Sequence, residues 1–316
     1  MQNKSVFCYL PNERFRVDRR YGWAIDTAEE CLSLTSWEEE ILVKIAQSKY
    51  LEFDQIQSYE KLLGRDFEKS VLDEILFGME VRRVLTRYKM FIPNKEDTLV
   101  FYGLDFWGMI KARQDLGIQL HKGICWYPKK DRVQRGLPQE TCSDVKRILM
   151  GNQILLELSK ARVPIQASGV METFRSLGDE AHPPLVRSTI NVEIDETSIL
   201  AFEVVRSYAT SYLEAVSKMG RYYKLLKDKN YLLKNYHNHK EFPQIVFVVE
   251  NEEHAKVLKR HFQEKGVWNL DDVTVLFSED ELIQNNVKYS IYELDDEDQK
   301  IWYELPTIQE VEVKYA

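Results

Sequence analysis

Residues 199–206 read ILAFEVVR, an almost wholly apolar run that holds one carboxylate, Glu203, and ends in Arg206. Its β-branched and aromatic residues predict a strand, and its apolar character predicts that the strand is buried. A buried strand rarely tolerates an acid unless that acid is exposed, paired or part of a functional site. The surroundings of Glu203 are therefore the first question that this sequence raises.

The segments around this strand alternate between strand and helix patterns. A strand at 188–195 precedes it across Glu196-Thr197, a two-residue hairpin connection. The later segments are a helix (207–229), a strand (243–250), a helix (251–266), a strand (272–278) and a short helix (279–286). The strand at 243–250 is continuously apolar, as is typical of parallel pairing. The order ββαβαβα predicts an α/β domain over residues 181–316.

The front half predicts a second domain, over residues 36–120. Three helical patterns (36–51, 52–64 and 66–78) precede two strand patterns (80–92 and 98–104) and a further helix (105–117). Ser36 is the expected N-cap of the first helix, and Gly64 and Gly78 are the expected ends of the next two. Three helices followed by a hairpin are the layout of a winged helix, in which the third helix enters the major groove of DNA.

This layout selects a set of expected contacts with double-stranded DNA. They lie on the third helix, at the base of the hairpin, near its tip, and in a basic linker that with its helix spans 121–180. They are Lys69, Ser70, Arg82, Arg83, Arg87, Lys89, Lys95, Lys129, Lys130 and Arg132. The alternative is that these charges form a solvated surface, or that the winged helix docks a protein. Residues 1–35 receive no assignment.

Charge distribution favours the front half as the DNA-facing part. The net charge is −8, but residues 1–160 hold 25 Lys+Arg against 24 Asp+Glu, whereas residues 161–316 hold 18 against 27. The four cysteines are scattered without a CxxC pair, which disfavours a zinc site and fits reduced thiols in the cytoplasm. No apolar run is long enough to span a membrane, and no signal peptide is evident.

The chain resembles the replication-relaxation family of plasmid and conjugative-element proteins. The resemblance rests on Tyr102, Leu104 and Gly108 in a Tyr-x-Leu-x-x-x-Gly pattern, on Phe202–Val204, and on Lys218 and Tyr222 in a Lys-x-x-x-Tyr pattern. It covers the chain from about Trp37 to about Phe262. It implies a DNA-binding accessory factor in replication or transfer of a mobile element.

The second domain also looks like the restriction-endonuclease core, in which an Asp on one strand and Glu-x-Lys on the next hold a divalent metal. Two carboxylates bind the hard cation, and the lysine positions the attacking water. Glu203 matches the Glu, but Val205 replaces the Lys, and the HPPLVR stretch before the hairpin lacks the expected Asp. A surviving nuclease, with Mg²⁺ or Mn²⁺, would draw on Glu193, Asp195, Glu203 and Lys218, with Asp195 and Glu203 on the metal.

Other candidate sites are weaker. His237 and His239 lie two apart in a polar segment that reads as a surface loop, and Tyr222 and Tyr223 lie on an apolar-rich helix where tyrosine is usually core. The sequence contains neither GxxxxGK[ST] nor Gly-x-Ser-x-Gly, so an ATP-driven motor or a serine hydrolase of that kind is not expected.

Three hypotheses follow. The first is a non-enzymatic DNA-binding protein of replication or conjugation whose nuclease-like domain forms a homodimer or holds a replication or transfer protein. The second is a metal-dependent nuclease that uses Glu203. The third is a winged-helix transcriptional regulator whose second domain senses a ligand or a peptide.

Overall fold

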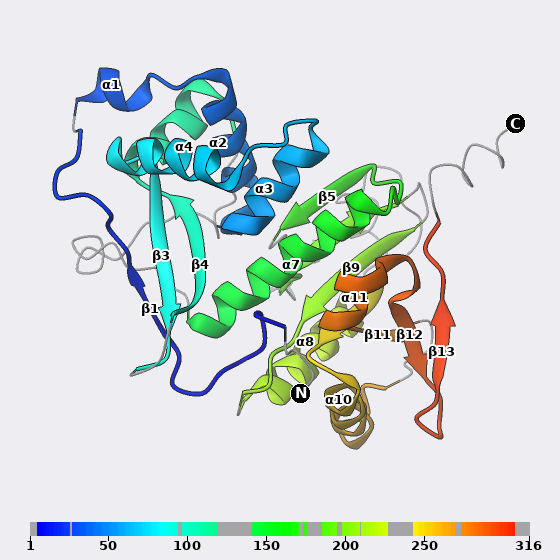
Figure 1. Ribbon diagram of the computed structural model, residues 1–316. Helices are drawn as coiled ribbons and strands as arrows, with labels where there is room; N and C mark the ends of the chain where they lie inside the picture. The colour runs from blue at the N-terminus through cyan, green and yellow to red at the C-terminus, as the bar shows by residue number, and fades with distance from the viewer. Residues whose placement is uncertain are drawn as a thin grey trace, which may run out of the picture. The chain divides into compact units, whose positions relative to one another are not determined.

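The computed structural model describes residues 5–25, 27–93, 97–118, 141–170, 173–175, 185–194, 198–208, 210–226, 243–268 and 273–306. The chain divides into two compact units (Figure 1). The N-terminal unit is Leu10–Asn152, and the C-terminal unit combines Met1–Tyr9 with Gln153–Ala316. The architecture is a mixed α/β fold with a principal sheet in each unit. No helix in the described ranges is both long and apolar enough to cross a bilayer.

The N-terminal unit is built on a four-stranded antiparallel sheet of order β1-β3-β4-β2. Its elements in chain order are β1 (Arg14–Val17), α1 (Ala28–Leu32), α2 (Ser36–Ser48), β2 (Leu51–Glu52), α3 (Phe53–Leu62), α4 (Lys69–Val81), β3 (Leu85–Phe91), β4 (Asp97–Leu104), α5 (Phe106–Ile110), the π-helical turn η1 (Lys111–Asp115) and the first part of α7 (Cys142–Lys160). The short strand β2, between α2 and α3, pairs with the hairpin strand β4.

The helix ends differ from the sequence prediction in two places. The N-cap of α2 is Thr35, not Ser36, because Thr35 and Glu38 form a reciprocal capping box. Helix α4 continues past Gly78 to Val81, and β3 begins only at Leu85. Residues 80–84, which the sequence assigned to a strand, are therefore not part of one. The turn that ends α4 places Arg83 at a φ of 55°, and the Val84 N–H bonds back to the Met79 carbonyl.

Gly108, one of the residues that carry the family resemblance, packs its helix directly on the backbone. A Cβ atom at this position would lie 2.1 Å from the Val84 carbonyl oxygen. The same carbonyl accepts a hydrogen bond from the Asp105 N–H at 2.9 Å. Only glycine allows α5 to approach the start of β3 this closely.

The C-terminal unit is built on a seven-stranded sheet of order β13-β12-β11-β10-β9-β8-β5. Its elements after α7 are β5 (Ala167–Val170), β6 (Thr173–Arg175), β7 (Leu185–Arg187), β8 (Ile190–Glu193), β9 (Ile199–Val204), α8 (Ser211–Leu226), β10 (Gln244–Val249), α10 (Glu252–Glu264), β11 (Val275–Glu279), α11 (Asp280–Asn286), the 3₁₀ turn η2 (Val287–Tyr289), β12 (Ile291–Leu294) and β13 (Lys300–Tyr303). Strand β10 lies parallel to both β9 and β11, which confirms the parallel pairing predicted from its continuous apolar run.

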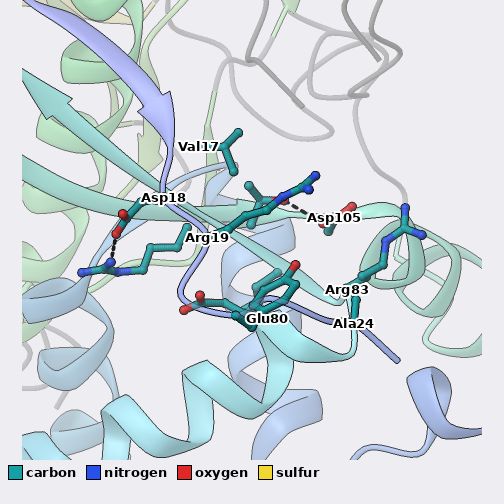
Figure 2. Close-up of a pocket in the computed structure, with 11 residues that line it drawn as sticks. Val17, Asp18, Arg19, Ala24, Glu80, Arg83 and Asp105 are labelled. Atoms are coloured by element: carbon teal, nitrogen blue, oxygen red, sulfur yellow. Dashed lines mark hydrogen bonds and ion pairs between the residues drawn. The ribbon is translucent and has the colours of Figure 1, made fainter. Parts of the chain in front are cut away.

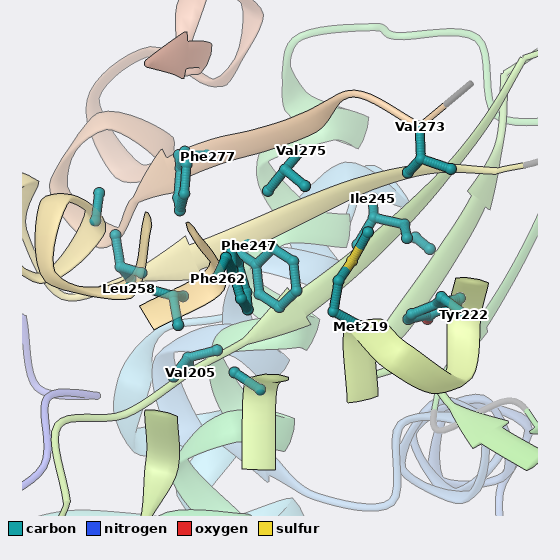
Figure 3. Packing of buried hydrophobic residues seen from close by; sticks show 14 of the residues in the cluster. Val205, Met219, Tyr222, Ile245, Phe247, Leu258, Phe262, Val273, Val275 and Phe277 are labelled. Atoms are coloured by element: carbon teal, nitrogen blue, oxygen red, sulfur yellow. The ribbon is translucent and has the colours of Figure 1, made fainter. Parts of the chain in front are cut away.

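One row of β9 side chains joins the main apolar core of this unit. Ala201 and Val205 pack with Met219 and Tyr222 of α8 and with Phe247 of β10 (Figure 3). Residues two apart on a strand share a face, so Glu203 also lies on this face. Its carboxylate is thus placed in the sheet face that α8 covers.

The start of the described chain is tied to the C-terminal unit. The Tyr9 N–H donates to the Glu250 carboxylate at 2.7 Å, and the Tyr9 ring lies 5.9 Å from that of Tyr208. Gln284 of α11 donates to the Ser5 hydroxyl at 3.2 Å. The next residues run into β1, so residues 5–9 belong to the C-terminal unit and residues 10–17 to the N-terminal unit.

Candidate functional site

Glu203 is buried, with 1% of its surface exposed, and its carboxylate is paired. The Lys218 ammonium forms an ion pair with Oε2, and the Tyr222 hydroxyl donates to Oε1 at 2.6 Å. Lys218 and Tyr222 lie four residues apart on α8 and therefore face the strand together. Glu203 and the Lys-x-x-x-Tyr pattern are separate features of the sequence, and in the structure the lysine and the tyrosine of that pattern both bond the Glu203 carboxylate.

The strands beside Glu203 supply no second carboxylate at its level. On β10, Phe247 is paired with Glu203. On the β8 side, Ile190 pairs with Phe202, so the preceding residue, Thr189, lies opposite Glu203. The Thr189 hydroxyl accepts from the Val204 N–H at 3.2 Å, and Ser188 is fully buried. In the restriction-endonuclease pattern two neighbouring acids bind the divalent cation. The described residues contain no group of three or more His, Cys, Asp or Glu side chains that could hold a metal.

The other residues of the nuclease hypothesis lie apart from Glu203. Val205, at the expected lysine position, is in the apolar core, and the ammonium comes from α8 instead. Glu193 pairs with Ile199, four residues along β9 from Glu203, which is about 13 Å at the rise of a strand. The structure therefore does not bring Glu193 to Glu203, while Asp195 lies outside the described residues.

The predicted contacts on α4 stand at its exposed first turn. Lys69 and Ser70 are both exposed. Lys69 pairs with Asp54 at 3.0 Å, and both side chains are about two-thirds exposed, at 69% and 65%. Such a surface pair contributes little to stability, so a phosphate can replace the aspartate at small cost. Farther along α4, the exposed face carries Glu74 and Phe77 rather than further cations.

The two arginines after α4 differ in what they do. Arg82 pairs with Glu38 and donates to the Ser33 carbonyl at 2.7 Å, with 17% of its side chain exposed. It links α4 to the start of α2. Arg83 occupies the left-handed position described above and lines a pocket of about 340 Å³.

Arg87 and Lys89 of β3 share one carboxylate. Arg87 forms an ion pair with Asp18, and the Lys89 ammonium lies 3.6 Å from the same carboxylate. Across the sheet Arg87 pairs with Tyr102, whose pKa burial raises to about 12. Glu80 of α4 adds to that increase and Arg87 opposes it, so this face of the sheet lies within electrostatic reach of α4.

Strand β1 adds two arginines that sequence reasoning missed. Arg16 pairs with Lys89 and Arg14 with Phe91, so both lie on the face that carries Lys89 and Arg87. Both arginines are exposed, and neither has an ion-pair partner among the described residues. The Arg16 guanidinium lies over the Phe91 ring, 5.1 Å from its centroid. We call Arg14, Arg16, Arg87 and Lys89 the wing strip; two of its four cations, Arg87 and Lys89, contact Asp18.

The pocket lies at the inner end of this strip (Figure 2). Its lining combines Arg19, Arg83 and Arg87 with Asp18, Glu80 and Asp105. Figure 2 shows Arg19, Arg83 and Asp105 among the side chains that line the pocket. Asp105 itself caps α5 through the Phe106 N–H and accepts from Thr86 at 2.9 Å. Asp105 thus serves the fold, whereas Arg19, which also lines the pocket, is exposed.

Several predicted residues lie outside the described ranges. They are Lys95 at the hairpin tip, the linker residues Lys129, Lys130 and Arg132, and His237 and His239.

Comparison with models of protein families found no match. A search of curated proteins found no match either, so the family resemblance stays a prediction. Among solved structures, the chain is similar to protein VC1899 from Vibrio cholerae, with a TM-score of 0.26, 7% identity, and coverage of 87% of this chain and 56% of that chain. It is also similar to the restriction endonuclease FokI bound to DNA, with a TM-score of 0.23, 12% identity, and coverage of 78% and 43%. The matches span about half the length of these two proteins.

Proposed function

We propose that this chain is a DNA-binding protein that uses its N-terminal unit as a winged helix. The observation that carries the proposal is the wing strip. Its cations lie on β3, the first strand of the hairpin that follows three helices, and on β1, which pairs with β3. The pairing of β2 with β4 supports it, because the strand between the first two helices of a winged helix joins the hairpin in the same way. A role in replication or conjugative transfer rests on the family resemblance.

The charges indicate how the unit would meet a duplex. The wing strip follows one face of the hairpin, where guanidinium groups can bond phosphates in a bidentate manner. The first turn of α4 offers Lys69 and Ser70 at a helix N-terminus, the end of a recognition helix that reads base edges. Because Glu74 and Phe77 follow on α4, most of the affinity would come from the wing strip.

In this proposal the C-terminal unit is a restriction-endonuclease-like scaffold that does not cut. The support is the closed cluster of Glu203, Lys218 and Tyr222: the ammonium and the hydroxyl occupy the carboxylate that a metal would need. Thr189 and Phe247 flank it where an acid is required.

Fluorescence anisotropy of the full chain with duplex DNA tests the proposal across a salt series. The logarithm of the affinity should fall linearly with the logarithm of salt concentration. Arg14→Ala combined with Arg16→Ala should reduce that slope by about 2, since each phosphate contact contributes roughly 0.9. Arg260→Ala is the matched control, because Arg260 is 59% exposed on α10 and lies outside the strip.

The loss should be similar for unrelated duplex sequences, because phosphate contacts carry no sequence information. Absence of duplex binding at low salt would falsify the proposal. An unchanged slope in the double variant would remove the wing strip from it.

A further inference from the structure

Strand β13 ends the seven-stranded sheet with three consecutive exposed apolar side chains. Ile301 is 48% exposed, Trp302 49% and Tyr303 41%. In the sheet order β13 pairs with β12 alone, and no other strand of the described chain pairs with its outer side (Figure 1). Proteins usually protect such an edge with charges, proline or a covering element, because its unpaired backbone invites another strand.

The hydrogen-bond phase shows which backbone groups face outward. The Asp295 N–H donates to the Gln299 carbonyl, and Leu294 then pairs with Lys300. In an antiparallel pair, hydrogen-bonded and non-hydrogen-bonded positions alternate, so Ile301 and Tyr303 turn their backbone groups toward β12. Lys300, Trp302 and Glu304 turn theirs toward the open edge.

The charges along this edge are complementary to those of a second, antiparallel copy of the same edge. Residues 300–304 read KIWYE. If two copies of this segment run antiparallel about an axis at Trp302, Lys300 faces Glu304 of the other copy, and Ile301 faces Tyr303. The outward backbone groups of Lys300, Trp302 and Glu304 are then in phase and can form about six hydrogen bonds. This symmetric match is what an isologous interface requires.

We propose that β13 is a dimerisation strand, which pairs antiparallel with β13 of a second copy of this chain and joins the two sheets. Side-chain contacts within the chain fix both ends of the segment. Lys300 bonds Glu279 at 2.7 Å and Glu252 at 3.0 Å, while Glu304 bonds Lys288 at 2.8 Å. Lys300 keeps 18% of its side chain exposed and Glu304 keeps 51%. The inference concerns the C-terminal unit alone and does not depend on DNA binding.

Light scattering coupled to size exclusion measures the outcome on the full chain. Between about 1 and 200 µM, a range suited to a small interface, the mass should rise from 37.4 kDa to about twice that value. Lys300→Glu places two acids against each other, and Glu304→Lys places two lysines together, so each variant alone should stay monomeric. An equimolar mixture of the two variants should form a dimer, because every cross-axis pair is then opposite in charge.

A second pair of variants keeps the test independent of those ion pairs. Trp302→Arg should give a monomer of unchanged circular dichroism, whereas Trp23→Arg, at a tryptophan 69% exposed on the N-terminal unit, should dimerise as the wild type does. A wild-type chain that stays monomeric throughout the range overturns the proposal, and so does a dimer that survives Trp302→Arg. A chain that dimerises only after removal of residues 307–316 overturns it as well, because its own C-terminal segment would then be the occupant.

Discussion

Removal of the Lys218 ammonium tests whether Glu203 is a closed structural pair. Glu203 has 2% of its side chain exposed and Lys218 12%. Lys218→Met therefore leaves a carboxylate in the core whose remaining side-chain donor among the described residues is the Tyr222 hydroxyl. Breaking a buried pair by removing one partner costs about 3–5 kcal/mol. Because solvent reaches part of Lys218, we expect the lower end, about 3 kcal/mol, which is a roughly 150-fold change in the unfolding equilibrium.

The measurement is equilibrium unfolding in urea, followed by circular dichroism. Tyr222→Phe should cost about 1.5–3 kcal/mol, the range for a hydrogen bond to a charged group. The double variant Glu203→Leu with Lys218→Met should come within about 1 kcal/mol of the wild type, because an apolar pair can replace a buried ion pair. Lys224→Met is the control on the same helix, since Lys224 is exposed.

A cost below about 1 kcal/mol for Lys218→Met would refute this reasoning, because such a small value is typical of a solvated pair. Stabilisation of the wild type by millimolar Mg²⁺ or Mn²⁺ that Glu203→Leu removes would restore the metal hypothesis instead.

Three further predictions concern single residues. Arg83→Gly should stabilise the N-terminal unit by about 1 kcal/mol, since glycine adopts the left-handed turn without strain, while duplex affinity falls; an unchanged affinity would make Arg83 purely structural. Gly108→Ala should destabilise by more than about 2 kcal/mol in urea, because its Cβ would meet the Val84 carbonyl, whereas Gly220→Ala, at a helical glycine with open space, should not. Burial lowers the pKa of His254 to about 4; Arg206 also lowers this pKa, and Glu250 raises it. The folded state therefore favours the neutral ring, and stability is lost as the pH falls from about 6.5 to 4. His254→Asn should remove about 3 kcal/mol of that pH dependence, measured as the wild-type minus variant difference in urea unfolding at each pH; equal pH profiles would contradict it.

The order of strands and helices in the C-terminal unit could be read from the sequence because its signals are local. A continuous apolar run such as 243–250 and an amphipathic run such as 251–266 each specify their own element. The closeness of Lys218 to Glu203 could be suggested for a related reason: a helix that follows a strand packs back on it. The register that puts Thr189 beside Glu203 was not readable, because it depends on how β8 and β9 are paired rather than on either strand.

The wing strip was not predictable for a similar reason. Strand β1 is only four residues long, and its partner β3 begins more than 65 residues later in the chain. The alternation of arginine with apolar residues in RFRV is a signal, but it is too short to stand out in an unassigned segment. The predicted end of α4 at Gly78 was wrong for a local reason. Glycine is the usual residue at a helix end, but here the left-handed residue after the helix is Arg83.

The bond between Tyr9 and Glu250 has a consequence for biosynthesis. The two residues are 241 positions apart, so the ribosome must add most of the chain before Tyr9 can meet its acceptor. At about 5–20 residues per second, the delay is roughly 10–50 s. During that time the opening residues can pair with β3 and contact α7, where Lys146 forms an ion pair with Glu13 at 2.7 Å. A bulky fusion placed before Ser5 would slow the late closure onto Glu250.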